Sequence, residues 1–191
     1  MSVRTRLSRS LVMVAVAAAT LAVPTSASAA SSTASCAVTW GSLDKSHASS
    51  TNAHLATTRT GRHDCYDRVV FEFEDSFDGY QVRYVDQVRT EPDGWVLPVT
   101  GGARLQVTLS AGIFDDDDAR PTYPTDHVVD VTGYKTLRDV EFGGANSIGV
   151  AGGEWHSTFG IGVRARLPYR AFVLPGPGNH SRLVIDVAHR W

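Results

Sequence analysis

Hydrophobic and polar residues alternate along short stretches of this chain. The clearest stretch spans residues 67–74, which read DRVVFEFE. Val69, Phe71 and Phe73 would share one face of an extended segment, whereas Arg68 and Glu72 would share the other. A period of two with a charged outer face predicts a half-buried antiparallel strand.

The same period recurs further along the chain, between turn signals rich in Gly, Pro and Asp. We expect further strands near residues 80–88, 95–99, 103–110, 128–131, 137–142, 159–163, 170–174 and 182–187, with long loops at 110–127 and 143–153. No window carries a convincing apolar stripe of helical period. The pattern predicts an all-β, mainly antiparallel fold, a two-sheet β-sandwich of about seven to nine short strands.

The first thirty residues differ from the rest. Arg4, Arg6 and Arg9 precede an apolar run, and small residues follow at Ala27 and Ala29. This order predicts a secretory signal peptide over residues 1–30, in preference to a retained transmembrane helix. Residues 31–65 are rich in Ser, Thr and Ala without sustained periodicity, so we expect a loosely structured N-terminal arm there. The sandwich domain then covers residues 66–191.

The net charge of the chain limits the classes of molecule that it can bind. The whole chain has a formal net charge of −2, and removal of the first thirty residues takes away three Arg and no acid, so the exported part has a net charge of −5. An acidic domain does not hold polyanions by bulk electrostatics, which argues against nucleic acid, and it lacks a basic surface for anionic lipid. We expect a secreted, extracellular monomer that does not bind membranes after cleavage and that associates with the cell wall.

The chain has two cysteines, Cys36 and Cys65. In an oxidising compartment, an isolated pair most simply forms a disulfide. The alternatives are a reactive thiol beside His63 and a lipidated Cys36. Thr33 stands where a lipidation motif needs an apolar residue, so the disulfide is preferred.

Motifs for catalysis and cofactors are missing from the sequence. There is no G-x-S-x-G, H-E-x-x-H or P-loop motif, so we expect no catalytic residues, no cofactor and no enzyme activity. The sharpest polar cluster is the acidic run Asp115, Asp116, Asp117 and Asp118. It could bind Ca²⁺, but it lacks the alternate ligand spacing and the Gly of a calcium loop, so a solvated acidic loop is preferred.

Four aromatic residues fall outside the inward-facing pattern. They are Trp95, Tyr123, Trp155 and Trp191, which we place in loops or at chain ends. Flat aromatic faces can stack on sugar rings, so these residues are candidates for a glycan or partner surface. The alternative is that each caps the core from a loop.

The sequences of several predicted strands resemble those of a known family. DRVVFEF at 67–73, GYQVRYVDQV at 79–88, GGARLQVTLS at 101–110 and YRAFVLPGPGNHSRLVIDVAH at 169–189 resemble the actinobacterial AMIN-like domain. The resemblance covers roughly residues 66–189 and implies a β-sandwich related to the AMIN domains of cell-wall amidases, which are non-catalytic modules that bind peptidoglycan. No amidase domain is attached here, and the matching phrases are core strands, so no binding residue carries over.

Together these expectations describe a secreted, non-catalytic envelope module that binds cell-wall glycan. One alternative is a protein-interaction module that docks an envelope partner through its loops or an open sheet edge. A second alternative is a secreted hydrolase whose site has no recognised motif.

Overall fold

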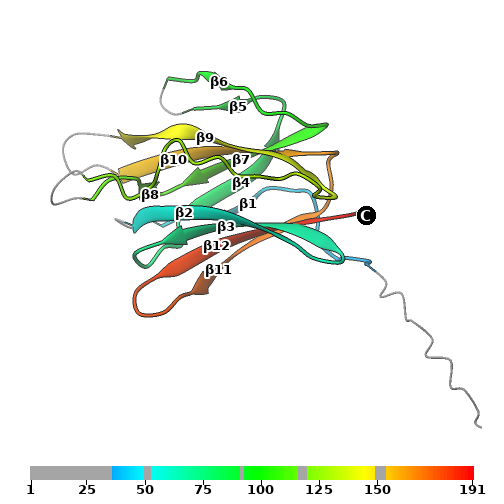
Figure 1. Cartoon of the computed structure of the whole chain (residues 1–191), viewed down its shortest axis with the longest axis horizontal. Helices are drawn as coiled ribbons and strands as arrows, with labels where there is room; N and C mark the ends of the chain where they lie inside the picture. Colours follow the sequence, from blue (N-terminus) through cyan, green and yellow to red (C-terminus); the bar gives the residue numbers. More distant parts are fainter. Residues whose placement is uncertain (1–35, 50–52, 91–92, 116–119, 149–153) are drawn as a thin grey trace, which may run out of the picture. The chain divides into compact units, whose positions relative to one another are not determined.

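The computed structural model describes residues 36–49, 53–90, 93–115, 120–148 and 154–191 (Figure 1). The predicted signal peptide, residues 1–30, lies outside these residues. Within the described part, the chain forms twelve strands and no helix. The strands are β1 (Lys45–His47), β2 (Ala53–Arg62), β3 (Tyr66–Phe73), β4 (Tyr80–Val85), β5 (Val88–Arg89), β6 (Val96–Leu97), β7 (Ala103–Leu109), β8 (Ala111–Gly112), β9 (Leu137–Ile148), β10 (Glu154–Val163), β11 (Tyr169–Pro175) and β12 (Ser181–Ala188).

Ten of these strands form two five-stranded sheets. The first sheet has the order β1-β4-β7-β10-β9, the second has the order β11-β12-β3-β2-β8, and β5 pairs with β6 in a separate hairpin. Every pairing is antiparallel except the short parallel contact between β2 and β8. The predicted all-β, mainly antiparallel sandwich is confirmed, although short strands such as β1, β5 and β8 raise the strand number above the expected range.

The core lies between the two sheets and follows the predicted period of two. Val69, Phe71 and Phe73 of β3 are fully buried, as are the alternate apolar residues of β7 and β12. Phe71 and Phe159 meet across the core in an edge-to-face contact, with 4.8 Å between ring centroids. Burial of these alternating side chains supplies the main driving force for closing the sandwich.

The expectation of a loosely structured arm over residues 31–65 differs from the structure, because β1 and β2 lie within that segment. β2 is a ten-residue strand that pairs with β3, and its residues Ala53, Leu55 and Thr58 are buried. An irregularity between Leu55 and Thr57 shifts the register by one residue. A bulge of this kind breaks the alternation, and the small or hydroxylated inward residues weaken the hydrophobic signal further.

Two other expectations are wrong. Residues 128–131 form no strand, since Asp130 accepts a hydrogen bond from the backbone N–H of Thr132 (2.8 Å) and closes a turn. The predicted start of the loop at residue 143 is also wrong, because β9 continues through Gly143 and Gly144 to Ile148. Gly144 has φ +114°, which a residue with a side chain rarely adopts, and a register shift lies beside it. The two glycines therefore belong to an irregular strand and do not mark the start of a loop.

The hairpin of β5 and β6 covers part of the outer face of the first sheet. A side chain at Gly160 of β10 would collide with Val99 and crowd Leu97, so glycine allows the hairpin to lie close to the sheet.

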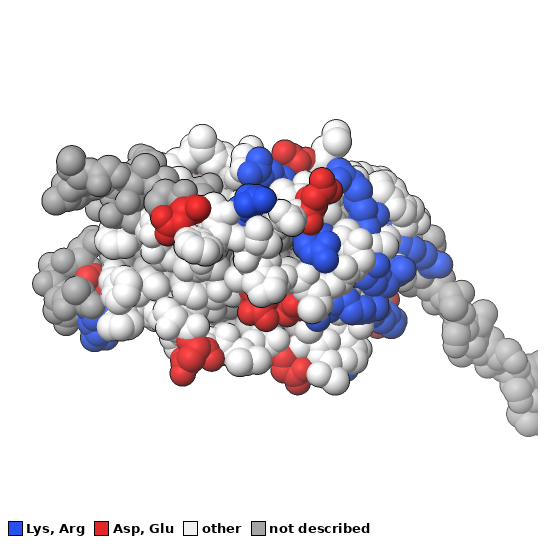
Figure 2. Space-filling view, turned by 90° about the horizontal axis from the view of Figure 1, so that it is seen from above, with Lys and Arg blue, Asp and Glu red and all other residues white. Residues whose placement is uncertain are grey.

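Charged side chains are unevenly distributed over the surface. Figure 2 views the molecule from above, with Lys and Arg gathered mainly in its right-hand part and Asp and Glu more scattered. No helix of the described residues is long and apolar enough to span a membrane.

Candidate binding surface

Tyr123 belongs to the core and is not a surface residue. It is 1% exposed, and its ring lies 5.3 Å from that of Phe142 and 5.7 Å from that of Phe159. The backbone N–H of Thr122 donates to the carbonyl of Ile113 (2.8 Å), which turns this part of the loop toward the sandwich. The alternative interpretation, in which the aromatic residue caps the core from a loop, describes Tyr123 better than a ligand surface.

The three tryptophans of the predicted surface do not gather. Trp95 follows the turn between β5 and β6 and is 72% exposed, whereas Trp191 is 68% exposed and donates from Nε1 to the carbonyl of Arg166 (3.2 Å). Trp155 lies in β10, not in a loop, and is half-buried beside Gly112. In the part of the chain that the structure describes, none of the three rings contacts another, so they do not form one platform.

Most of the acidic run lies outside the described residues, namely Asp116, Asp117 and Asp118. Asp115 is described, and its carboxylate lies 3.2 Å from the guanidinium of Arg120. Among the described residues, no group of three or more His, Cys, Asp or Glu could hold a metal ion. The calcium interpretation of the run therefore stays a prediction without a described site.

The structure brings together a different set of aromatic and charged side chains on the outer face of the second sheet. We call it the arginine–aromatic face, and it comprises Trp40, Tyr66, Arg68, Arg170, Phe172 and Asp186. Five of these residues occupy outward positions on three adjacent strands, β3, β11 and β12, whose alternate residues fill the core. Trp40 comes from the segment that precedes β1.

The register places three charged residues in one row across the sheet. Asp186 of β12 lies directly opposite Arg68 of β3 on one side and Arg170 of β11 on the other. Directly opposite side chains in a sheet are within contact distance, so the carboxylate lies between two guanidinium groups. Sequence reasoning identified each strand but missed this row, since only the pairing of the strands reveals it.

Asp186 binds both arginines. Its carboxylate accepts hydrogen bonds from Arg68 Nε (2.6 Å), from Arg68 Nη2 (3.0 Å) and from Arg170 Nε (2.8 Å). The Asp186 side chain is 0% exposed, whereas those of Arg68 and Arg170 are 24% and 40% exposed. The hydrogen bond to Asp186 raises the pKa of the Arg68 guanidinium. The buried carboxylate thus fixes two partly exposed cations, and the row retains a net positive charge.

Aromatic rings surround these cations. The Arg170 guanidinium lies 4.3 Å from the Trp40 ring centroid and 5.0 Å from that of Phe172, and Arg68 lies 5.3 Å from that of Tyr66. Such cation–π contacts orient the rings and the guanidinium groups relative to one another. The face therefore presents flat apolar surfaces next to guanidinium groups whose N–H groups not bound to Asp186 can donate to the hydroxyl or carboxylate groups of a sugar.

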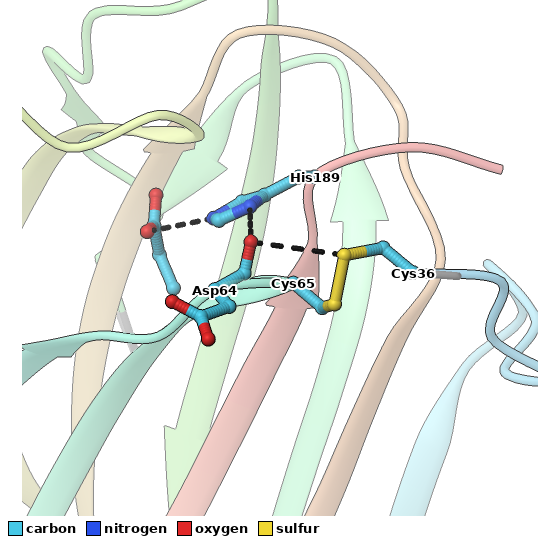
Figure 3. Close-up of a disulfide and its surroundings, with 5 residues drawn as sticks. Cys36, Asp64, Cys65 and His189 are labelled. Atoms are coloured by element: carbon cyan, nitrogen blue, oxygen red, sulfur yellow. Dashed lines mark hydrogen bonds and ion pairs between the residues drawn. A yellow bond between two sulfur atoms is a disulfide. The ribbon is translucent and has the colours of Figure 1, made fainter. Parts of the chain in front are cut away.

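The disulfide, drawn in Figure 3, lies next to the segments that carry two rings of this face. Cys36 and Cys65 are bonded, as the sequence predicts. Cys65 immediately precedes Tyr66, and Cys36 lies four residues before Trp40, so the bridge joins the two segments that carry these rings. The Trp40 and Tyr66 rings are in contact, with 5.7 Å between centroids.

His189 holds the end of β12 against the same bridge. Its Nδ1 lies 3.0 Å from the carbonyl oxygen of Asp64 (Figure 3). Its Nε2 lies 3.0 Å from Asp67 Oδ1. Asp67 Oδ2 accepts the backbone N–H groups of Thr136 (2.5 Å) and Leu137 (3.2 Å). Both ring nitrogens of His189 lie within hydrogen-bond distance of protein oxygens, so this partly buried Asp–His pair leaves no nitrogen to activate a nucleophile.

Comparison with known proteins gives one match. A family model described as the AMIN-like domain matches residues 53–189, from the first residue of β2 to the residue after β12. The match includes the three charged residues of the row and excludes Cys36 and Trp40. Neither the curated proteins nor the solved structures contain a match.

Proposed function

This chain belongs to the AMIN-like domain family, and from that membership we propose that it is a secreted, non-catalytic module that binds cell-wall glycan through the arginine–aromatic face. The family supports association with the cell envelope. The disulfide fits an oxidising compartment outside the cytoplasm, and the signal-like residues 1–30 are consistent with export.

The observation that carries the proposal is the row of Arg68, Asp186 and Arg170 with aromatic rings beside it. Peptidoglycan combines sugar rings with carboxylate-bearing peptides. Its sugars have apolar faces that stack on aromatic rings, and its carboxylates can accept hydrogen bonds from the guanidinium N–H groups that do not bind Asp186. Because Asp186 and the disulfide hold these groups in place, little side-chain entropy would be lost on binding.

The test is co-sedimentation of the purified, disulfide-bonded protein with insoluble peptidoglycan. We expect the wild-type protein to pellet with the glycan and Trp40→Ala to weaken binding by roughly two- to tenfold, since one stacking ring is lost. Trp95→Ala is the matched control, because Trp95 is an exposed tryptophan on a hairpin outside the face. The thermal midpoint of each variant checks that it is folded.

Two outcomes would contradict the proposal. Wild-type protein that stays in the supernatant would remove glycan binding altogether. Equal binding by Trp40→Ala and wild-type protein would show that the arginine–aromatic face is not the binding surface.

Two backbone groups at the free edge of β11 are occupied within the chain, which weighs against docking by strand addition at the start of this strand. The Gly41 carbonyl accepts the Tyr169 N–H (3.0 Å), and the Tyr80 hydroxyl donates to the Ala171 carbonyl (3.2 Å). These contacts occupy outward-facing backbone groups of the edge strand, a common way of protecting an edge. If cross-linking at the cell surface recovers one protein while peptidoglycan fails to bind, the protein-docking alternative replaces the glycan proposal.

A further inference from the structure

A second group of arginines lies on the outer face of the first sheet, where β4 ends and β7 begins. β4 and β7 pair so that Arg83 lies opposite Gln106 and Val85 lies opposite Arg104. Arg83 and Arg104 are thus diagonal neighbours on one face, a relation that places side-chain origins about 7–8 Å apart. Long guanidinium side chains reach the same space from such positions.

Arg166 adds a third guanidinium from the loop between β10 and β11. It donates from Nε to the Ser42 hydroxyl (3.2 Å) and from NH2 to the Ser42 carbonyl (2.9 Å). Its guanidinium also lies 4.7 Å from the centroid of the Tyr84 ring. At Gly102, a side chain would collide with the carbonyl of Arg164, so glycine lets this loop approach the start of β7. The fold therefore fixes the position of Arg166.

The three arginines line a surface hollow of about 530 Å³, whose other walls include Tyr84, Gly102 and Asp86. Asp86 is exposed and is the single carboxylate among the residues that line the hollow. Across the described ranges of the chain, none of the three arginines forms an ion pair with a carboxylate. They differ in this respect from Arg68 and Arg170, which share Asp186.

Uncompensated cations that converge on one hollow repel one another. The protein holds Arg104 in place nonetheless, because its Nε donates to the Val99 carbonyl (2.8 Å). Arg83 Nε, by contrast, is buried without a hydrogen-bond partner within the described residues. Because the chain as a whole carries a net charge of −2, this accumulation of positive charge is local. It leaves guanidinium donors for a negatively charged ligand to occupy.

We propose that the hollow lined by Arg83, Arg104 and Arg166 is a binding site for an oxyanion, the carboxylate or phosphate group of an acidic envelope compound. Guanidinium forks pair with either group through two parallel hydrogen bonds. The volume is that of a small-ligand site and exceeds the size of a single anion, so it also accommodates part of the compound that carries the charge. The site is independent of glycan binding at the arginine–aromatic face.

The test is a titration of the folded protein followed by NMR of the arginine Nε–Hε groups. The probes are inorganic phosphate and glutarate, each compared with sodium chloride at the same ionic strength. We expect saturable shifts in the millimolar range and a loss of affinity of about tenfold or more in Arg104→Gln. Arg89→Gln is the matched control, because Arg89 lies in the β5–β6 hairpin and its guanidinium binds Gly94 and Gln87 instead.

The two probes separate the sources of the anion. Saturation by phosphate alone identifies a phosphate-bearing ligand, saturation by glutarate alone identifies a carboxylate-bearing ligand, and saturation by both supports a general oxyanion site. Shifts no larger than those with chloride, or equal weakening by Arg89→Gln and Arg104→Gln, would overturn the proposal. Since no peptidoglycan enters this experiment and Trp40→Ala should leave it unchanged, its result is separate from the test of glycan binding.

Discussion

Replacing Asp186 with Ala removes the buried carboxylate that Arg68 and Arg170 share. Loss of one member of a buried ion pair costs about 3–5 kcal/mol when the remaining charge stays buried. Here the arginine side chains are 24% and 40% exposed, so water can partly solvate them after the change. We therefore expect Asp186→Ala to lower the free energy of unfolding by about 2–3 kcal/mol, below the fully buried case. Urea denaturation followed by tryptophan fluorescence measures this difference.

Glu72→Ala is the matched control on the same face of the same sheet. Glu72 pairs with Arg59, whose side chain is 58% exposed, and exposed pairs contribute less than about 1 kcal/mol. A second variant, Arg68→Met/Asp186→Leu/Arg170→Met, replaces all three charges with apolar side chains and should recover most of the lost stability. The reasoning fails if Asp186→Ala destabilises the protein no more than Glu72→Ala does.

Three further predictions concern other parts of the sandwich. Removing the disulfide by Cys36→Ser/Cys65→Ser should lower the free energy of unfolding by about 3–4 kcal/mol in the chain-entropy treatment, as measured by urea denaturation against the oxidised wild-type protein. Burial raises the pKa of Tyr169 above its ordinary value of 10.0, so the stability that its neutral phenol contributes is complete below pH 10 and is lost as the pH rises further; alkaline titration by absorbance, with parallel unfolding curves, measures this loss. Gly162→Ala would drive a methyl group into the carbonyl of Thr100 and should cost about 1–3 kcal/mol, seen as a lower thermal midpoint.

The sequence predicts the interior of this protein better than its surface. Strands such as β3 and β7 could be identified because a buried face imposes a strict alternation on neighbouring residues. β9 shows the limit, since its second half contains glycines that usually indicate a loop. In this strand the glycines are compatible with pairing, because β10 lies alongside and a register shift accommodates the irregular backbone.

The arginine–aromatic face could not be predicted from one sequence, for a geometric reason. Arg68 and Asp186 are 118 residues apart, and neither residue is unusual in its own strand. A shift of one residue in the pairing of β3 with β12 would place them on opposite faces of the sheet. Tyr123 illustrates the converse error, because a polar, turn-rich loop suggests exposure, whereas its backbone hydrogen bonds to Ile113 direct the ring inward.

The position of β12 determines when this protein can fold. β12 is the last strand along the sequence, yet in the second sheet it lies inside the edge, between β11 and the central strand β3. During synthesis, β3 lacks its neighbour on that side until residues 181–188 have left the ribosome, so the early strands cannot complete a stable sheet by themselves. The second sheet can therefore close only after the last of its strands is available, so its central strand β3 stays without one neighbour until a late stage of folding.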